Sequence, residues 1–165
     1  MDAYAAESWS EFAGATAGAA AALTGLVFVA VSINLQPILA DPRMPARAGQ
    51  ALILLAAPVF LSLALLVPGQ PAAALGVELF VLAGLVGPLL GWLCRPAARP
   101  AHQPLAAWIV GSIGPAAVLT VSPLLAGLGV LTDSLGGLYW LPVAVAVSLL
   151  AGLINAWVLL IEILR

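Results

Sequence analysis

Five long apolar stretches, none of which contains a basic residue, constrain this chain more than any other feature of its sequence. They cover residues 13–35, 48–67, 72–94, 105–131 and 138–164. The hydrocarbon core of a bilayer is about 30 Å thick, and about 20 apolar residues of α-helix cross it. The pattern therefore predicts an all-α fold, a polytopic membrane helical bundle with five transmembrane helices that form a single transmembrane domain over residues 1–165.

The composition excludes a soluble fold. Hydrophobic residues make up 64% of the chain and charged residues 7%, whereas soluble domains are roughly 45–50% apolar and about 25% charged. So few charges cannot cover a surface that faces water. The single cysteine also excludes a small domain held by disulfides. We therefore expect the lipid bilayer to be the main partner of this chain.

Proline, glycine and polar residues separate the stretches and predict turns between the helices. The stretch 105–131 also contains Pro115 and Pro123 in its interior. A proline removes one backbone hydrogen bond from a helix and bends it. The sequence is compatible with one kinked helix or with a broken helix over this segment.

The basic residues, all arginine, predict the orientation. They are Arg43, Arg47, Arg95, Arg99 and Arg165. With five spans these arginines all lie on one side of the membrane, and the positive-inside rule makes that side cytoplasmic. We therefore predict an N-out, C-in topology. The outer side then collects acidic residues without a base, namely Asp2, Glu7, Glu11 and Asp133.

Two of the predicted helices carry stripes of glycine at helical spacing. The first stripe is Gly14, Gly18 and Gly25, and the second is Gly84, Gly87 and Gly91. Small residues at this spacing let two helices approach closely in lipid. We expect both stripes to be helix-packing surfaces. The alternative is that the glycines leave room for a ligand.

Glu78 is the one acidic residue in the interior of the third stretch. It lies about 9 Å below the outer boundary at 1.5 Å per residue, on the opposite face from the second glycine stripe. We therefore expect this helix to be buried on two sides, either centrally within the subunit or at a subunit interface. A carboxyl at this depth is either neutral, hydrogen-bonded or extended to the headgroups, or it is an ion or proton site near an outer vestibule.

The last stretch carries Ser148, Asn155 and Glu162 at intervals of seven residues, which places them on one face of a helix. Such residues join helices by hydrogen bonds, or they line a path filled with water. Asn34 ends the first stretch at the same depth. We expect it to lie near Asn155 or Glu162.

The residues needed for catalysis and cofactor binding are missing or scattered. The chain has no lysine, and its only histidine, His102, lies in a proline-rich loop. No nucleophile with a base, no metal-ligand spacing and no phosphate-binding loop is present. The net charge of −2 argues against nucleic acid as a partner. We therefore expect neither an enzyme nor a cofactor.

The first helix resembles a group of small multi-pass bacterial membrane proteins of unestablished function. The resemblance rests on Trp9 and Phe12 followed by the run at 23–35, LTGLVFVAVSINL. Some members of that group are labelled modulators of a membrane protease, which would imply an interaction protein. The resemblance carries no functional residue. The use of arginine and alanine is similar to that of GC-rich bacterial genomes and suggests a bacterial inner membrane.

Three functional hypotheses follow. The first is a small oligomeric pore or ion-conducting protein, in which the acidic outer face concentrates cations and Glu78 or the polar face of the last helix lines the path. A homo-oligomer is expected because a chain with five spans and no internal repeat does not form two inverted halves. The second hypothesis is a non-catalytic regulator that docks on a larger membrane complex. The third is a protein that binds lipid or another small hydrophobic molecule.

Overall fold

A computed structural model describes residues 3–96, 99 and 104–163 of the chain. The described residues are helices joined by short turns, with no strand among them. In chain order the elements are η1 (Ala6–Trp9), α1 (Ser10–Ile33), α2 (Leu35–Ala40), α3 (Met44–Leu65), α4 (Ala72–Leu93), α5 (Leu105–Trp108), η3 (Ile109–Ile113), α6 (Gly114–Thr132), η4 (Gly137–Tyr139) and α7 (Trp140–Ile163). The predicted all-α fold is confirmed.

Five continuous helical segments are long and apolar enough to cross a membrane, which confirms the predicted spans. They are Ala6–Ile33, Met44–Leu65, Ala72–Leu93, Leu105–Thr132 and Gly137–Glu162. The predicted boundaries differ by a few residues, chiefly because the first helix starts before residue 13. The short helix α2 was expected to be part of a loop. It forms between the first two spans and buries Ile38.

The fourth span is one unbroken helical path that contains a π-helical turn, η3. The N–H of Gly114 bonds to the carbonyl of Ile109, five residues earlier. Pro115 explains the distortion, because it has no N–H to offer to the carbonyl of Gly111. A widened turn at this point bends the helix without ending it. Of the two possibilities that the sequence left open, a single continuous helix through the prolines is the one observed.

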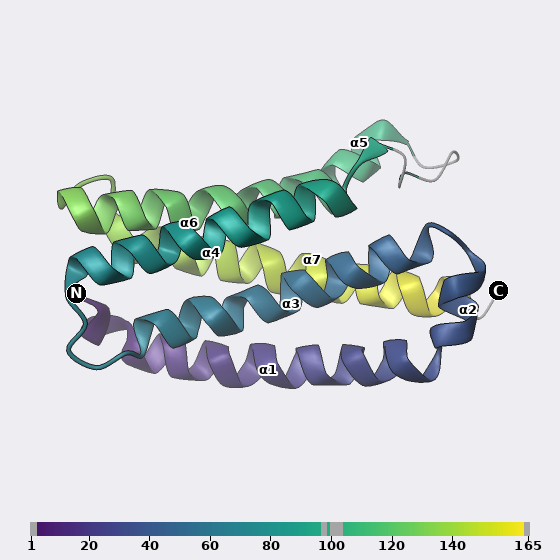
Figure 1. Ribbon diagram of the computed structural model, residues 1–165, viewed down its shortest axis with the longest axis horizontal. Helices are drawn as coiled ribbons and strands as arrows, with labels where there is room; N and C mark the ends of the chain where they lie inside the picture. Colours follow the sequence, from purple (N-terminus) through teal and green to yellow (C-terminus); the bar gives the residue numbers. More distant parts are fainter. Residues whose placement is uncertain (1–2, 97–98, 100–103, 164–165) are drawn as a thin grey trace.

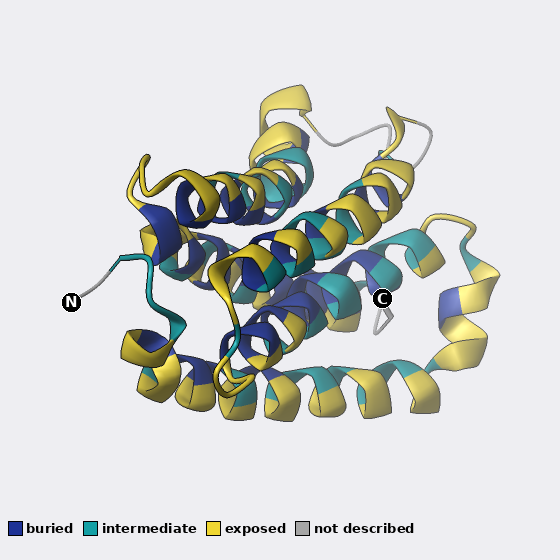
Figure 2. Ribbon diagram, turned by 60° about the vertical axis from the view of Figure 1, so that its left-hand side comes forward, coloured by how far each residue is buried: buried dark blue, intermediate teal, exposed yellow. Residues whose placement is uncertain are grey.

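The central helix of the bundle is α3, which packs against α1, α7 and α4, while α6 packs against both α4 and α7 (Figure 1). In the most apolar part of each helix, 61% of the residues of α3 are buried but only 11% of those of α1. The burial pattern in Figure 2 makes the same contrast visible. Helix α1 lies at the edge of the bundle with most of its surface uncovered.

The helix with Glu78, α4, is not the central helix of the single chain, and its burial at a subunit interface stays a prediction. Helix α4 packs mainly on α6 and leaves much of its surface exposed. The close approach depends on two glycines outside the predicted stripes, Gly76 and Gly127. A Cβ at Gly127 would lie 3.0 Å from the carbonyl oxygen of Gly76. The helix buried on several sides is α3, which has no glycine stripe.

The arginines of the long described segments lie at one end of the bundle, where Asp41 and Glu162 also lie. Arg43, Arg47 and Arg95 belong to segments at the end where α1, α4 and α7 finish, whereas Glu7 and Asp133 belong to the opposite end (Figure 1). Asp2 and Arg165 lie outside the described residues. These arginines share one end because an odd number of spans separates the two ends, and the N-out, C-in orientation stays a prediction.

The acidic end is closed by contacts between the N-terminal segment and the turn before α7. The N–H of Leu138 donates to the carbonyl of Ala3 over 2.8 Å. Trp9 is buried and meets Tyr139 edge to face, with 5.1 Å between ring centroids. Gly137 has a φ of +49° and no room for a side chain beside Ala3 and Tyr4. The first and last spans are therefore connected at this end.

Candidate functional site

Ser148, the first polar residue of the predicted seam, lies buried at the contact between α7 and α3. Its hydroxyl donates to the carbonyl of Leu54 over 2.6 Å. Pro58 occupies the position four residues further along α3 and has no N–H for that carbonyl. A backbone carbonyl without a partner is costly in an apolar interior. Ser148 therefore supplies the hydrogen bond that the proline removes.

Asn155 performs the same task two turns further along α7. Its side-chain amide donates to the carbonyl of Gly111 over 3.4 Å. Gly111 lies in η3, four residues before Pro115, so its carbonyl also lacks the usual donor. Both buried polar residues of α7 thus face a carbonyl that a proline has freed. This accounts for the seven-residue spacing that the sequence displays.

A second carbonyl of the π-helical turn receives donors from two more helices. The amide of Gln50 on α3 donates to the carbonyl of Ser112 over 3.2 Å. The thiol of Cys94, just after α4, lies 3.6 Å from the same oxygen. We call Gln50, Cys94, Gly111, Ser112 and Asn155 the η3 cluster. It joins α3, α4 and α7 to the distorted part of the fourth span, and it is the main polar cluster inside the described bundle.

The Cys94 thiol is neutral in this setting. Burial raises the pKa of the thiol from 9.0 to about 11. The thiolate is the reactive form of cysteine, so Cys94 acts as a weak hydrogen-bond donor and is a poor nucleophile at neutral pH.

Glu162 forms an ion pair with Arg47 at the arginine-rich end of the bundle. One guanidinium nitrogen lies 3.0 and 3.1 Å from the two carboxylate oxygens, and the side chains are 20% and 33% exposed. This pair connects α7 to the start of α3, 115 residues apart in sequence. The expected closeness of Asn34 to Asn155 or Glu162 produces no hydrogen bond among the described residues. Asn34 donates instead to the carbonyl of Ala30 in its own helix.

Glu78 remains separate from these polar residues. It is half-buried on α4 near the acidic end, and among the described residues it makes no hydrogen bond or ion pair. Glu78 belongs neither to the η3 cluster nor to the polar face of α7. Its proposed role as an ion or proton site stays a prediction.

The six glycines of the two predicted stripes differ in their surroundings. At Gly87 a Cβ would lie 2.6 Å from the methyl carbon of Thr120, so this glycine permits the close approach of α4 and α6. Open space surrounds the other five Cβ positions, which are Gly14, Gly18, Gly25, Gly84 and Gly91. These five pack against nothing within the described chain. Packing against another chain stays a prediction.

The second stripe opens a groove on the surface between α4 and α6. Its volume is about 570 Å³, and Gly84, Pro88 and Gly91 line one wall while Ala117 and Val121 line the other. The wall residues are apolar and exposed. In a bilayer such a groove faces lipid.

Sequence reasoning missed Gln50, the pairing of Arg47 with Glu162, and the two carbonyls of η3. A signal was present for the carbonyl of Gly111, because Pro115 stands four residues later and offers it no N–H. No group of three or more histidine, cysteine or acidic residues suited to a metal ion occurs in the described part of the chain. Comparison with protein-family models, with curated proteins and with solved structures found no match to this chain.

Proposed function

We propose that this multi-pass membrane protein is a non-catalytic interaction protein that docks through α1 onto another transmembrane helix. The observation that carries the proposal is the position of α1, an edge helix of which only a small part is buried in its own bundle. A helix whose packing within the chain is so limited is suited to contacts between chains.

The two faces of α1 support this role. The buried residues Ala13, Thr16 and Ala20 lie on one face and pack towards α3. Gly14 and Gly18 lie about 150° away around the helix axis and have open space at their Cβ positions. Small residues on an exposed transmembrane face let a second helix approach the backbone closely. The surface therefore has the properties of a helix-docking face.

The polar residues of α7 favour docking over conduction. A pore needs polar groups that are available to water or ions. Ser148 and Asn155 are buried and bond to carbonyls that prolines leave free, and Glu162 is paired with Arg47. Their positions are explained by the packing of the bundle. The pore hypothesis retains Glu78 as its remaining candidate.

We further propose the N-out, C-in orientation in a bacterial inner membrane. The support is the gathering of Arg43, Arg47 and Arg95 at one end of the bundle, with no described arginine at the end that holds Glu7 and Asp133, together with the arginine and alanine usage of the chain. In this orientation α1 begins at the outer surface, and Gly14 and Gly18 lie in the outer half of the bilayer.

A matched pair of phenylalanines allows a direct test. Phe28 lies beyond the glycines on the exposed side of α1 and is 61% exposed, whereas Phe60 on α3 is 55% exposed. Each is replaced by p-benzoylphenylalanine, and cell membranes are irradiated. We expect a protein adduct of defined mass from position 28 and only lipid adducts from position 60.

The variant Gly18→Leu supplies the specificity control. It places a large side chain in the middle of the docking face but contacts nothing in its own bundle. We expect it to abolish the adduct at position 28 while the purified protein keeps its helical content. Lipid adducts alone at position 28, or an adduct that survives Gly18→Leu, would contradict the proposal.

A further inference from the structure

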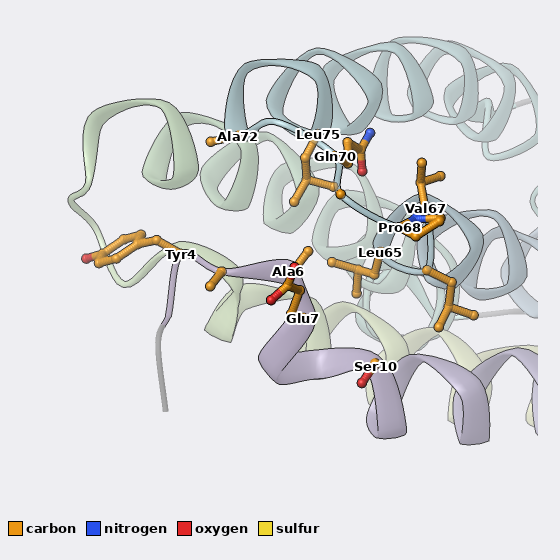
Figure 3. A pocket seen from close by; sticks show the side chains of 13 residues that line it. Tyr4, Ala6, Glu7, Ser10, Leu65, Val67, Pro68, Gln70, Ala72 and Leu75 are labelled. Carbon is orange, nitrogen blue, oxygen red and sulfur yellow. The ribbon is translucent and has the colours of Figure 1, made fainter.

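Two hollows of similar size on the bundle differ in what surrounds them. The pocket in Figure 3 has a volume of about 570 Å³ and opens at the acidic end. Its wall residue Glu7 is exposed, and the side-chain amide of Gln70 is buried too deeply for a ligand in the pocket to reach. The groove between α4 and α6 also has a volume of about 570 Å³, but it lies along two membrane-spanning helices. In a bilayer the groove is therefore filled by an acyl chain or by another helix.

The groove has the length of one leaflet of the bilayer. Its α4 wall runs from Ala83 to Cys94, and its α6 wall runs from Ile113 to Leu124. Each wall rises about 16 Å at 1.5 Å per residue, and half of a hydrocarbon core of about 30 Å is about 15 Å. Because α4 and α6 are antiparallel (Figure 1), Cys94 and Ile113 both lie at the arginine-rich end. The groove thus extends from the middle of the bundle to the level of the headgroups at that end.

The walls of the groove suit an acyl chain. Half of the lining residues are glycine or alanine, and none is charged. Two polar side chains line the groove, and both have a partner inside the bundle. The hydroxyl of Thr120 donates to the carbonyl of Ala116 over 2.8 Å, and the thiol of Cys94 lies 3.6 Å from the carbonyl oxygen of Ser112. A flexible apolar chain therefore covers these walls without leaving either side chain unpaired.

A positive charge is held at the headgroup end of the groove. Arg95 directly follows Cys94, and its guanidinium carbon lies 4.6 Å from the centroid of the Trp92 ring. Tryptophan is typical of the membrane interface, and the indole attracts the flat guanidinium through its ring face. The N–H groups around the edge of the guanidinium then remain available to an anion.

The acidic residues at this end of the bundle have other partners. Glu162 pairs with Arg47, and a carboxylate oxygen of Asp41 accepts the backbone N–H of Arg43. No carboxylate pairs with Arg95 in the part of the chain that the structure describes. A guanidinium matches the geometry of phosphate oxygens, and basic sites between transmembrane helices recognise anionic lipid headgroups. The charge at the end of the groove is thus complementary to such a headgroup.

We propose that the groove between α4 and α6 binds one acyl chain of an anionic phospholipid. The chain lies between the glycine-rich wall of α4 and Ala117 on α6, and the phosphate group contacts Arg95. The unpaired arginine at the headgroup end favours lipid over a second helix as the occupant. This surface is separate from the docking face of α1, so the inference does not rest on the proposed function.

Native mass spectrometry of the full chain, released from detergent micelles, counts the lipids that stay bound. Two probes share their palmitoyl and oleoyl chains and differ in the headgroup: phosphatidylglycerol is anionic, and phosphatidylcholine carries no net charge. We expect one phosphatidylglycerol to bind about fivefold more tightly than phosphatidylcholine, which is the gain that one arginine near a headgroup supplies. Glycerol 3-phosphate, which has the phosphate but no acyl chain, should not be retained.

Matched variants test the two halves of the site. Arg95→Gln should bring the ratio of the two affinities close to one, whereas Arg43→Gln removes another exposed arginine at the same end and should leave the ratio unchanged. Ala117→Leu fills the groove and should weaken the binding of both lipids severalfold. Ala146→Leu enlarges an exposed alanine of α7 outside the groove and should have no effect. Gly91→Leu is a second filling variant in case Ala117→Leu alters the helical content, which circular dichroism reports.

Three results would overturn the proposal. The two lipids bind equally well, or Arg43→Gln lowers the ratio as much as Arg95→Gln, or neither filling variant weakens lipid binding. A dimer that retains no lipid, and that Ala117→Leu dissociates, would overturn it as well, because a second chain would then occupy the groove.

Discussion

The bond from Ser148 to the carbonyl of Leu54 should stabilise the bundle only because Pro58 is present. Ser148→Ala removes the donor and leaves a buried carbonyl without a partner. Interhelical hydrogen bonds in membranes contribute about 0.6 kcal/mol on average and up to about 1.7 kcal/mol, and leaving a buried group unpaired costs about 1–3 kcal/mol. The Ser148 hydroxyl is fully buried and its bond is short, at 2.6 Å. We expect Ser148→Ala to lower the free energy of unfolding by about 1–2 kcal/mol.

The proline supplies the decisive second perturbation. Pro58→Ala restores a backbone N–H that can bond to the carbonyl of Leu54 inside α3. In that background Ser148→Ala should cost about 0.5 kcal/mol or less, which gives a coupling of about 1 kcal/mol in a double-mutant cycle. The cycle is measured by reversible unfolding in bicelles. Ser32→Ala serves as a control, because Ser32 is exposed and bonds within its own helix to Phe28. An equal loss with proline and with alanine at position 58 would refute the reasoning.

Three further predictions concern the other contacts. Arg47→Glu and Glu162→Arg should each destabilise the bundle by about 1 kcal/mol. The double exchange should recover most of that loss in the same unfolding assay. If the two losses simply add, the ion pair does not stabilise the bundle. Cys94 should react with a maleimide at pH 8 roughly a hundredfold more slowly than an unstructured cysteine, and faster as the pH rises toward its raised pKa of about 11; rapid labelling of the folded protein would contradict the burial. Gly87→Leu should destabilise the α4–α6 contact by about 1–3 kcal/mol, whereas Gly84→Leu should be neutral because its Cβ position is open; equal effects at the two sites would show that the contact at Gly87 is unimportant.

The number and type of the elements could be predicted because they depend on local chemistry. A run of about 20 apolar residues has few alternatives to a transmembrane helix, since the backbone must satisfy its own hydrogen bonds in lipid. The same principle explains why the fourth span continues through Pro115. A widened turn together with a donor from Asn155 removes the need to end the helix.

The neighbours of each helix could not be predicted in the same way. All five spans are apolar over most of their surface, so hydrophobicity does not distinguish a central helix from an edge helix. The glycine stripes suggested which faces pack, but the close contacts of α4 and α6 also use Gly76 and Gly127. Arg47 and Glu162 are 115 residues apart, and no local pattern associates them.

Some polar residues of the bundle bond to a carbonyl that a proline leaves free, and others have no such role. Ser148 and Asn155 bond to the carbonyls that Pro58 and Pro115 leave free, so the requirements of the fold are sufficient to explain them. Neither Glu78 nor Gln70 has such a role. Glu78 has no partner among the described residues, and the amide of Gln70 is buried without one.

Some polar groups lower the stability of a fold and make no stabilising contact that would explain their presence. Such groups are the best candidates for functional residues. The same argument applies to the exposed glycines of α1, which weaken a helix and permit no close contact within the bundle. The docking proposal is consequently drawn from residues that packing leaves unexplained. The seven-residue polar face of α7, the most regular polar pattern in the sequence, is accounted for by the architecture.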